Sequence, residues 1–169
     1  IHHIPGDLTD NYNPREHTLN LSDKVYGSRS IVAIGVAAHE CGHAIQHARH
    51  YVPLTVRSAI IPAANIGSSL AWPLVLIGLI IPRLDFCMTI GILLFSLVVI
   101  LQLVTLPVEF NASRRAIQII RDSGYLAPDE LKGAKSVLKA AAMTYVAAMV
   151  SVSLQLLRLV ILRDSRDDD

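Results

Sequence analysis

Five consecutive residues, His39-Glu40-Cys41-Gly42-His43, combine two metal-binding side chains with a carboxylate at a fixed spacing. Residues four apart share one face of an α-helix, so both imidazoles can point at one ion. Glu40 lies about 100° further round the helix, where it can reach a metal-bound water but is poorly placed as a third ligand. The pattern predicts two zinc ligands and a general base. The alternative is a structural helix that carries these residues by chance.

The neighbouring residues disfavour that alternative. Ile31 to about Tyr51 reads as one helix, which Ser28 or Ser30 can cap and Pro53 ends. The helix is otherwise almost wholly apolar, and an ionisable cluster on a buried helix is costly unless it is paired or bound to a metal. The glycine inside the motif leaves room for another segment to approach the helix closely.

A zinc ion that keeps one position open for water needs a third protein ligand. Glu109 is the best candidate, because it directly follows the apolar run 86–108, where a charge is costly and often functional. An ordinary glutamate at the membrane interface is the alternative. His47 lies one further helical turn beyond His43, and it can support a ligand, contact the substrate or be a polar residue at the membrane edge. It is a weaker candidate ligand, because side chains at this spacing drift about 40° round a helix over two turns.

The distribution of apolar residues indicates a membrane protein with polar segments, although 52% hydrophobic residues decide little alone. Three apolar runs are long enough to cross a bilayer: about 63–81, 86–108 and 140–162. Only residues 82–85 join the first two runs, which allows a tight hairpin and nothing larger. Residues 1–62 and 109–139 should therefore emerge on the same side, which would be the catalytic side.

We predict a mainly α, multi-pass membrane protein with one domain, 1–169. Its catalytic part should consist of a short N-terminal β segment, the HExxH helix and a helix that carries Glu109. Residues 17–22 alternate polar and apolar and predict a strand, at a sheet edge where an extended substrate could pair through Asn20. Residues 109–121 and the segment that begins at Pro128 are also predicted to be helical. The competing interpretation is a soluble helical bundle with the apolar runs as its core.

Charge and chain ends add three expectations. The net charge of +1 gives no reason to expect nucleic acid as a partner. The segment 109–139 carries six Lys or Arg residues and the hairpin carries one, so the positive-inside rule places the catalytic side in the cytoplasm. The chain begins with Ile1 and without a recognisable signal peptide, so we expect it to be either a fragment of a longer protein or a processed product.

Two segments, VAAHECGHAIQHA (36–48) and PVEFNASRRAI (107–117), resemble the YugP-type neutral zinc metallopeptidases of bacterial membranes. The opening segment and the third apolar run are also similar, so the resemblance covers nearly the whole chain. It implies a multi-pass protein of the bacterial inner membrane with one zinc ion per chain and another membrane helix upstream. The gluzincin-like site that it implies uses Glu40 as the base and three ligands, His39, His43 and Glu109.

One position departs from the wider gluzincin pattern. Those enzymes often place an aspartate four residues after the ligand glutamate, where it orients a ligand histidine. Here that position is Ser113, whose hydroxyl can accept a hydrogen bond but carries no charge, and Asn111 could share the task. Arg114, Arg115 and His47 are candidates for stabilising the charge of the transition state, and the sequence does not choose between them.

The expected activity is that of an integral-membrane zinc endopeptidase, which hydrolyses peptide bonds with a zinc-activated water and Glu40 as the base. Its substrates would be proteins or peptides in or near the membrane. The alternative is a catalytically silent membrane scaffold or metal-binding protein that retains the fold. Glu40 favours the enzyme, because a scaffold has no need of a base beside the two histidines. The sequence indicates no oligomeric state.

Overall fold

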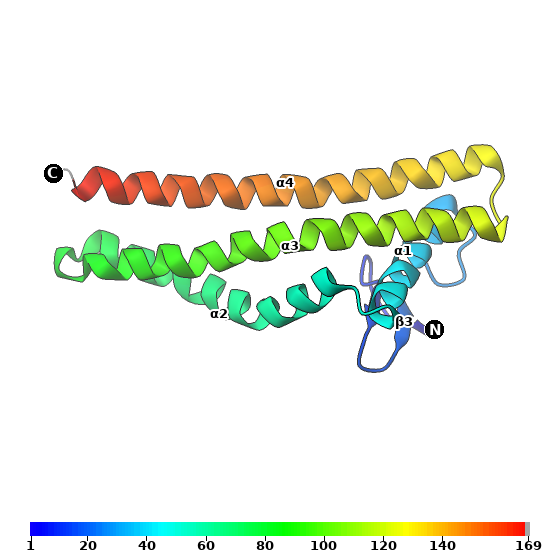
Figure 1. Ribbon diagram of the computed structural model, residues 1–169, viewed down its shortest axis with the longest axis horizontal. Coiled ribbons are helices and arrows are strands. Elements are labelled where there is room, and N and C mark those ends of the chain that lie inside the picture. Colours follow the sequence, from blue (N-terminus) through cyan, green and yellow to red (C-terminus); the bar gives the residue numbers. More distant parts are fainter. Residues whose placement is uncertain (168–169) are drawn as a thin grey trace. The chain divides into compact units, whose positions relative to one another are not determined.

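The computed structural model describes residues 1–167, with side chains through residue 165. Three short strands precede the helices (Figure 1). Strands β1, β2 and β3 cover His2–His3, Asn11–Asn13 and Thr18–Leu21. The helices are α1 (Ile31–Ala48), α2 (Val52–Ile80), the 3-10 turn η1 (Pro82–Leu84), α3 (Asp85–Ser123) and α4 (Pro128–Asp167). The predicted mainly α fold with a short N-terminal β segment is confirmed.

The three strands form one sheet in the order β1-β3-β2. β1 is parallel to β3, with His2 opposite Asn20, and β2 is antiparallel, with Tyr12 opposite Leu19. The strand predicted at 17–22 is therefore present, but its predicted place at a sheet edge is wrong. Strand β1 pairs with the side of β3 that β2 leaves free. Alternation within one strand does not reveal which other segments pair with it. A substrate cannot pair with β3 through Asn20, because both sides of the strand are already paired.

Capping determines where α1 begins and ends. The Ser30 hydroxyl accepts a hydrogen bond from the Ala33 N–H at 3.1 Å, as one of the two predicted caps. The helix ends at Ala48, slightly before the expected Tyr51. His50 takes a left-handed conformation with φ of 50°, and the N–H groups of His50 and Tyr51 both bond back to carbonyls of the last turn. This Schellman-type ending satisfies carbonyls that would otherwise lack a partner.

The contacts within the chain define two compact units, of which the first comprises Ile1–Leu54 and Pro107–Thr144. One buried cluster in this unit joins the sheet region to α1 and contains Leu21, Val25 and Ala33. A second cluster joins α1 to the C-terminal part of α3 and the first turns of α4: Ala38, Ala116, Ile120, Ala134 and Leu138. These apolar contacts hold the HExxH helix against the segment that carries Glu109.

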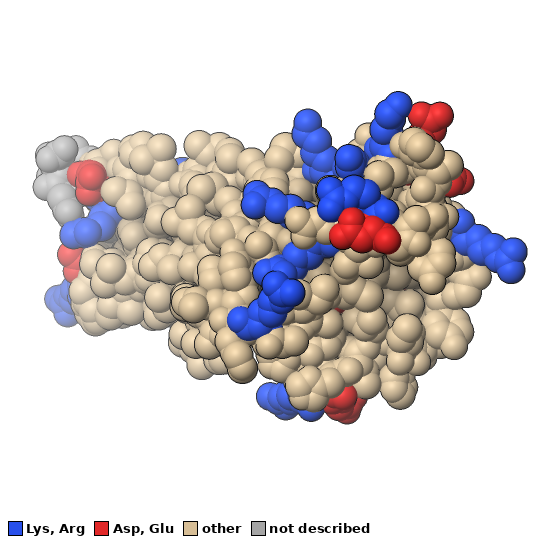
Figure 2. Space-filling model, turned by 45° about the vertical axis from the view of Figure 1, so that its right-hand side comes forward, with Lys and Arg blue, Asp and Glu red and all other residues tan. Residues whose placement is uncertain are grey.

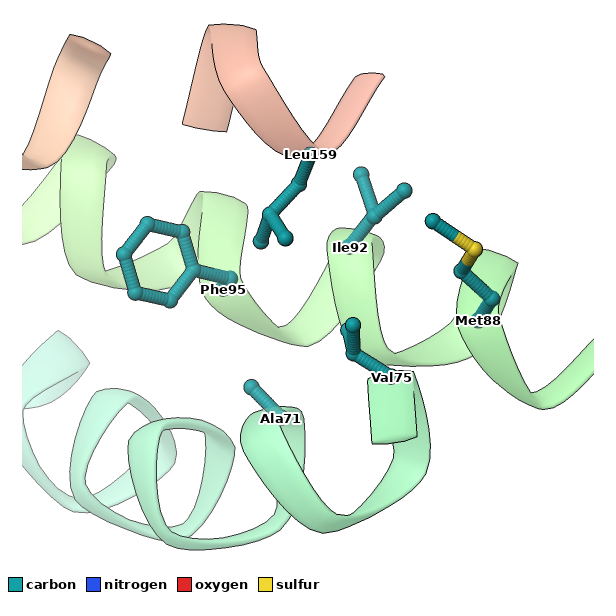
Figure 3. Packing of buried hydrophobic residues seen from close by; sticks show 6 residues of the cluster. All are labelled: Ala71, Val75, Met88, Ile92, Phe95 and Leu159. Atoms are coloured by element: carbon teal, nitrogen blue, oxygen red, sulfur yellow. The ribbon is translucent and has the colours of Figure 1, made fainter. Parts of the chain in front are cut away.

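The second unit comprises Thr55–Leu106 and the chain from Tyr145 onward. Its buried cluster brings together side chains from three helices: Ala71 and Val75 of α2, Met88, Ile92 and Phe95 of α3, and Leu159 of α4 (Figure 3). The tight η1 turn joins α2 to α3, as predicted for residues 82–85. Gly91 permits their close packing, because a Cβ atom there would lie 2.8 Å from the Ala71 carbonyl oxygen.

Three helical segments are long and apolar enough to cross a membrane: Val52–Ile80, Pro82–Ser123 and Pro128–Ser165. Many of their large apolar side chains are exposed, including Ile80, Leu93 and Leu154 at 73%, 63% and 60%. The face shown in Figure 2 has a broad area without charged side chains. A soluble bundle would bury such faces in its core, so these exposed surfaces favour the predicted membrane protein over that alternative. The predicted membrane boundaries near 63–81, 86–108 and 140–162 stay predictions.

Candidate metal centre

Helix α1 places His39 and His43 side by side on one face. Their ring centroids are 4.7 Å apart and the rings meet edge to face. This is the geometry that the spacing of four residues predicts, because the two positions lie one helical turn apart. Both side chains are largely buried, with 15% and 13% of their surface exposed. The two imidazoles thus face a protected position.

Glu109 meets these two rings from α3. Its Oε2 atom lies 3.1 Å from His39 Nε2 and 3.5 Å from His43 Nε2, and the residue is 2% exposed. One potential ligand atom from each residue lies within 4.8 Å of the others, so the three could hold a metal ion. Donor atoms 2.0–2.1 Å from a tetrahedral zinc ion are about 3.4 Å apart. The two measured separations bracket that value, and the donor set fits zinc.

Gly42 allows the two helices to approach closely enough for this contact. A Cβ atom at this position would lie 2.5 Å from the carbonyl oxygen of Ala112 on α3. Any larger residue would therefore collide with backbone rather than with a flexible side chain. The close approach expected from the sequence is confirmed, and the approaching segment is the helix that carries Glu109.

Glu40 lies beside the histidines in a nearly buried position, with 8% of its surface exposed. Burial raises the pKa of its carboxyl group, and the neighbouring histidines and the backbone N–H of Tyr12 partly oppose that increase. A carboxylate with a raised pKa is suited to accept and return a proton near neutral pH. Tyr12 belongs to β2, so the strand edge that faces away from β3 faces the site.

Contacts with Glu109 also affect His43. Burial by itself lowers the pKa of this imidazole, but the hydrogen bond and the negative charge of Glu109, together with the charge of Glu40, raise it more. The pKa of His43 therefore lies above its ordinary value in the metal-free site. A metal ion that binds here must displace a proton from the imidazole.

Two residues predicted to support the ligands lie behind them. The Ser113 hydroxyl is 3.2 Å from His39 Nδ1, the atom opposite the one that faces Glu109. Asn111 Oδ1 accepts a hydrogen bond from Arg115 Nε at 2.8 Å. Arg114 is exposed on the surface of α3. The transition-state roles predicted for the two arginines stay predictions, and the contact of Arg115 with Asn111 gives it a structural partner.

His47 is placed differently from these residues. Its Nδ1 atom is 2.9 Å from the Tyr12 hydroxyl, and its ring stacks on that of His17 at 5.3 Å. The Tyr12 hydroxyl is also 3.3 Å from His17 Nδ1. The structure therefore groups His47 with two aromatic residues of the sheet region. The sequence had suggested no role for His17, whose neighbours are set by the β2–β3 turn.

Gln46 is a residue of the site that motif reasoning missed. It is fully buried and lies 3.0 Å, Oε1 to Nδ1, from His43. Its Nε2 atom donates to the Val108 carbonyl at 2.8 Å and to Asn111 Oδ1 at 3.1 Å. The available signal was a lone amide, three residues after a candidate ligand histidine, on a helix that is largely apolar outside the HExxH motif.

These observations define a class of protein: a mainly helical protein with candidate membrane spans, in which an HExxH helix and a later helical glutamate converge on one position that could hold a metal ion. The chain belongs to the family described as "putative neutral zinc metallopeptidase", which matches residues 1–164. It is 47% identical over 167 residues to the protein described as "putative membrane protease YugP" of Bacillus subtilis (strain 168). That match covers 98% of this chain and 74% of the relative. The resemblance drawn from the sequence is confirmed. No solved structure gave a significant match.

Proposed function

We propose that this protein is an integral-membrane zinc endopeptidase, with His39, His43 and Glu109 as ligands and Glu40 as the general base. The observation that carries the proposal is the position of Glu109 Oε2, at 3.1 and 3.5 Å from the two Nε2 atoms. A set of two histidines and one glutamate is typical of catalytic zinc sites, which keep a further position open for water or substrate. We expect one zinc ion per chain.

The residues of the site divide the chemistry between them. Zinc held by the three ligands would act as a Lewis acid toward water and the scissile carbonyl. Glu40 accepts a proton from the attacking water and then delivers it to the leaving amine. The burial of Glu40 keeps its carboxylate weakly hydrated, so its proton affinity suits both steps. The same burial excludes bulk water from the reacting groups.

The membrane spans suggest which substrates are accessible. We propose that proteins or peptides in or near the bacterial inner membrane are cleaved, on the cytoplasmic side, where residues 1–62 and 109–139 would lie. Support comes from the three candidate spans and from the description of the relative as a membrane protease. A catalytically silent scaffold with the same fold remains the second candidate, and the buried Glu40 beside the ligands favours the enzyme.

The test compares wild type with Glu40→Gln in one detergent preparation. We expect about one zinc per chain in both proteins, because Glu40 is not a ligand, and cleavage of an unfolded protein substrate by the wild type alone. Glu16→Gln is the matched control, because Glu16 is an exposed glutamate outside the site and its replacement should leave cleavage unchanged.

The outcomes separate the two candidates. Zinc in both proteins with cleavage only by the wild type and the control supports the peptidase. Equal cleavage by Glu40→Gln would remove Glu40 from the mechanism. Zinc binding without cleavage in the wild type, tested on several unfolded and membrane substrates, would favour the metal-binding scaffold. Failure of the wild type to bind zinc would overturn the ligand assignment.

A further inference from the structure

Gln46 occupies a position where an amide must be fully hydrogen-bonded. The residue has no exposed surface and lies one turn after His43 on a helix that is otherwise largely apolar. A buried amide without partners is costly, so its contacts determine whether it can be accommodated. Three partners surround it: His43, the Val108 carbonyl and Asn111.

Two of these partners determine which end of the amide is the nitrogen. The backbone carbonyl of Val108 can only accept a hydrogen bond, so the Gln46 atom 2.8 Å from it must be Nε2. The Asn111 atom that contacts Gln46 accepts a bond from Arg115 Nε, so it is an oxygen and also requires a donor. Both neighbours therefore require the same orientation, in which Oε1 faces His43.

This orientation determines where His43 carries its hydrogen. An amide oxygen can only accept, so the His43 Nδ1 atom 3.0 Å away must donate and carry a hydrogen. Glu109 Oε2, 3.5 Å from Nε2, can also only accept, so in the metal-free site it faces the Nε2–H of the protonated imidazole. A metal ion would take the place of that proton and leave the hydrogen on Nδ1. That is the tautomer a metal ligand needs at Nε2.

His39 lacks an equivalent constraint. Its Nδ1 atom contacts the Ser113 hydroxyl at 3.2 Å, and a hydroxyl can either donate or accept. The Nδ1 partner of His39 can therefore adapt to the imidazole, whereas the Nδ1 partner of His43 requires a hydrogen on that atom. Gln46 also bonds the carbonyl of Val108, the residue immediately before Glu109, so one side chain links the second histidine to the backbone beside the glutamate.

We propose that Gln46 is a positioning residue, which fixes His43 in the Nδ1–H tautomer and aligns it with Glu109 for metal binding. The proposal rests on the metal site proposed above, but it does not require peptidase activity. Loss of such a supporting hydrogen bond typically weakens metal binding about 10- to 100-fold. Behind the proposed ligands, a series of hydrogen bonds then runs from Gln46 through Asn111 to Arg115.

The test uses the full chain in detergent and two variants, Gln46→Met and Gln46→Glu. Methionine fills a similar volume but offers His43 no comparable acceptor. Glutamate keeps the acceptor for Nδ1–H but places an oxygen against the Val108 carbonyl, so it should lower thermal stability. We expect zinc affinity, measured by chelator competition, to fall about 10- to 100-fold in Gln46→Met and to stay near wild type in Gln46→Glu. Ser113→Ala is the matched control, because it removes the partner of His39 Nδ1 and keeps the partner of His43 Nδ1.

A second measurement does not depend on metal. ¹⁵N NMR of histidine-labelled, metal-free protein, at a pH where His43 is neutral, should show a larger share of the Nδ1–H tautomer of His43 in wild type, Gln46→Glu and Ser113→Ala than in Gln46→Met, because Gln46 favours a hydrogen on Nδ1 and Glu109 favours one on Nε2. Gln46→Met should lose that preference. If zinc affinity instead follows thermal stability across both Gln46 variants, Gln46 only packs α1 against α3. An unchanged tautomer and affinity in Gln46→Met would equally overturn the proposal. Zinc binding without cleavage would contradict the proposed peptidase but not the proposed role of Gln46, because zinc affinity and the His43 tautomer are measured without a substrate.

Discussion

At the scale of single residues, the three proposed ligands receive unequal support from their surroundings. Glu109 is almost completely buried and contacts both histidines, whereas each histidine has a different partner at Nδ1. Asn111 and Ser113 both lie behind the rings, but Asn111 contacts Gln46, which in turn contacts His43. The support of the site therefore rests on uncharged groups rather than on the aspartate that the wider gluzincin pattern uses.

Replacing Glu109 with glutamine should abolish tight zinc binding with little change in shape. The glutamine oxygen can still accept a hydrogen bond from His39 Nε2–H, so the metal-free fold should persist. A neutral amide is a poor zinc ligand, so zinc affinity should fall by more than the roughly 10- to 100-fold expected from loss of a supporting residue. Chelator competition measures the affinity, with Glu16→Gln as control. Zinc binding close to that of wild type would exclude Glu109 as a ligand.

The raised pKa of His43 predicts how pH affects the metal-free protein. Because the folded pKa lies above the unfolded value of about 6.5, the protonated imidazole stabilises the fold fully below that pH. This contribution is lost as pH rises through the folded pKa. The difference in Tm between wild type and His43→Asn, both without metal, should therefore shrink as pH rises above about 6.5. A difference that grows with pH in that range would contradict the direction of the shift.

At the scale of secondary-structure elements, the crossing of α1 and α3 positions the site. The two helices approach at Gly42 and Ala112, one turn from the glutamate that completes the ligand set. Apolar side chains of α4 then pack on both helices and hold the crossing in place. The sheet contributes Tyr12, whose backbone N–H reaches Glu40. Each element thus supplies a contact that the HExxH helix alone cannot provide.

Two glycines on α1 test the importance of this crossing. At Gly42 a methyl group would meet the Ala112 carbonyl at 2.5 Å, so Gly42→Ala should separate the helices, cost about 1–3 kcal/mol and weaken zinc binding. At Gly35 a methyl group would meet only Leu138, at 3.9 Å, an ordinary contact. Gly35→Ala should therefore be neutral or stabilising by up to about 1 kcal/mol. Thermal unfolding and zinc titration of both variants check this, and equal effects would refute the steric argument.

At the scale of the whole molecule, the long apolar helices determine where the site can operate. Their exposed leucine, isoleucine and phenylalanine side chains suit a lipid environment, and charged groups within the second unit are few among the described residues. The proposed topology places the η1 hairpin on one side of the membrane. The polar segment 109–139 would then lie on the other side together with α1.

Fusions to alkaline phosphatase, which folds only outside the cytoplasm, test this topology. The proposed orientation predicts activity for fusions after Arg83 and after Arg163, and none for a fusion after Tyr125. Green fluorescent protein at the same positions should give the opposite pattern. A fully reversed pattern would move the catalytic side out of the cytoplasm. Equal signals after Arg83 and Tyr125 would mean that the run 86–108 does not cross the membrane.

The sequence by itself determined features that depend on local geometry. The spacing of His39 and His43 placed them on one helical face, because the α-helix repeats every 3.6 residues. The lengths of the apolar runs predicted the candidate spans, since helix rise and bilayer thickness are both constant. The capping serine predicted the start of α1. Each inference needed only residues within a few turns of one another.

The tertiary structure alone decided which distant segments meet. It showed β3 as the central strand, because pairing depends on where residues 1–13 return rather than on alternation within the strand. It brought Glu109 to two histidines 66 and 70 residues away, through backbone contact at Gly42. It also revealed Gln46, whose proposed positioning role depends on contacts with Val108 and Asn111 on another helix. Such contacts arise from packing between elements, which no local pattern encodes.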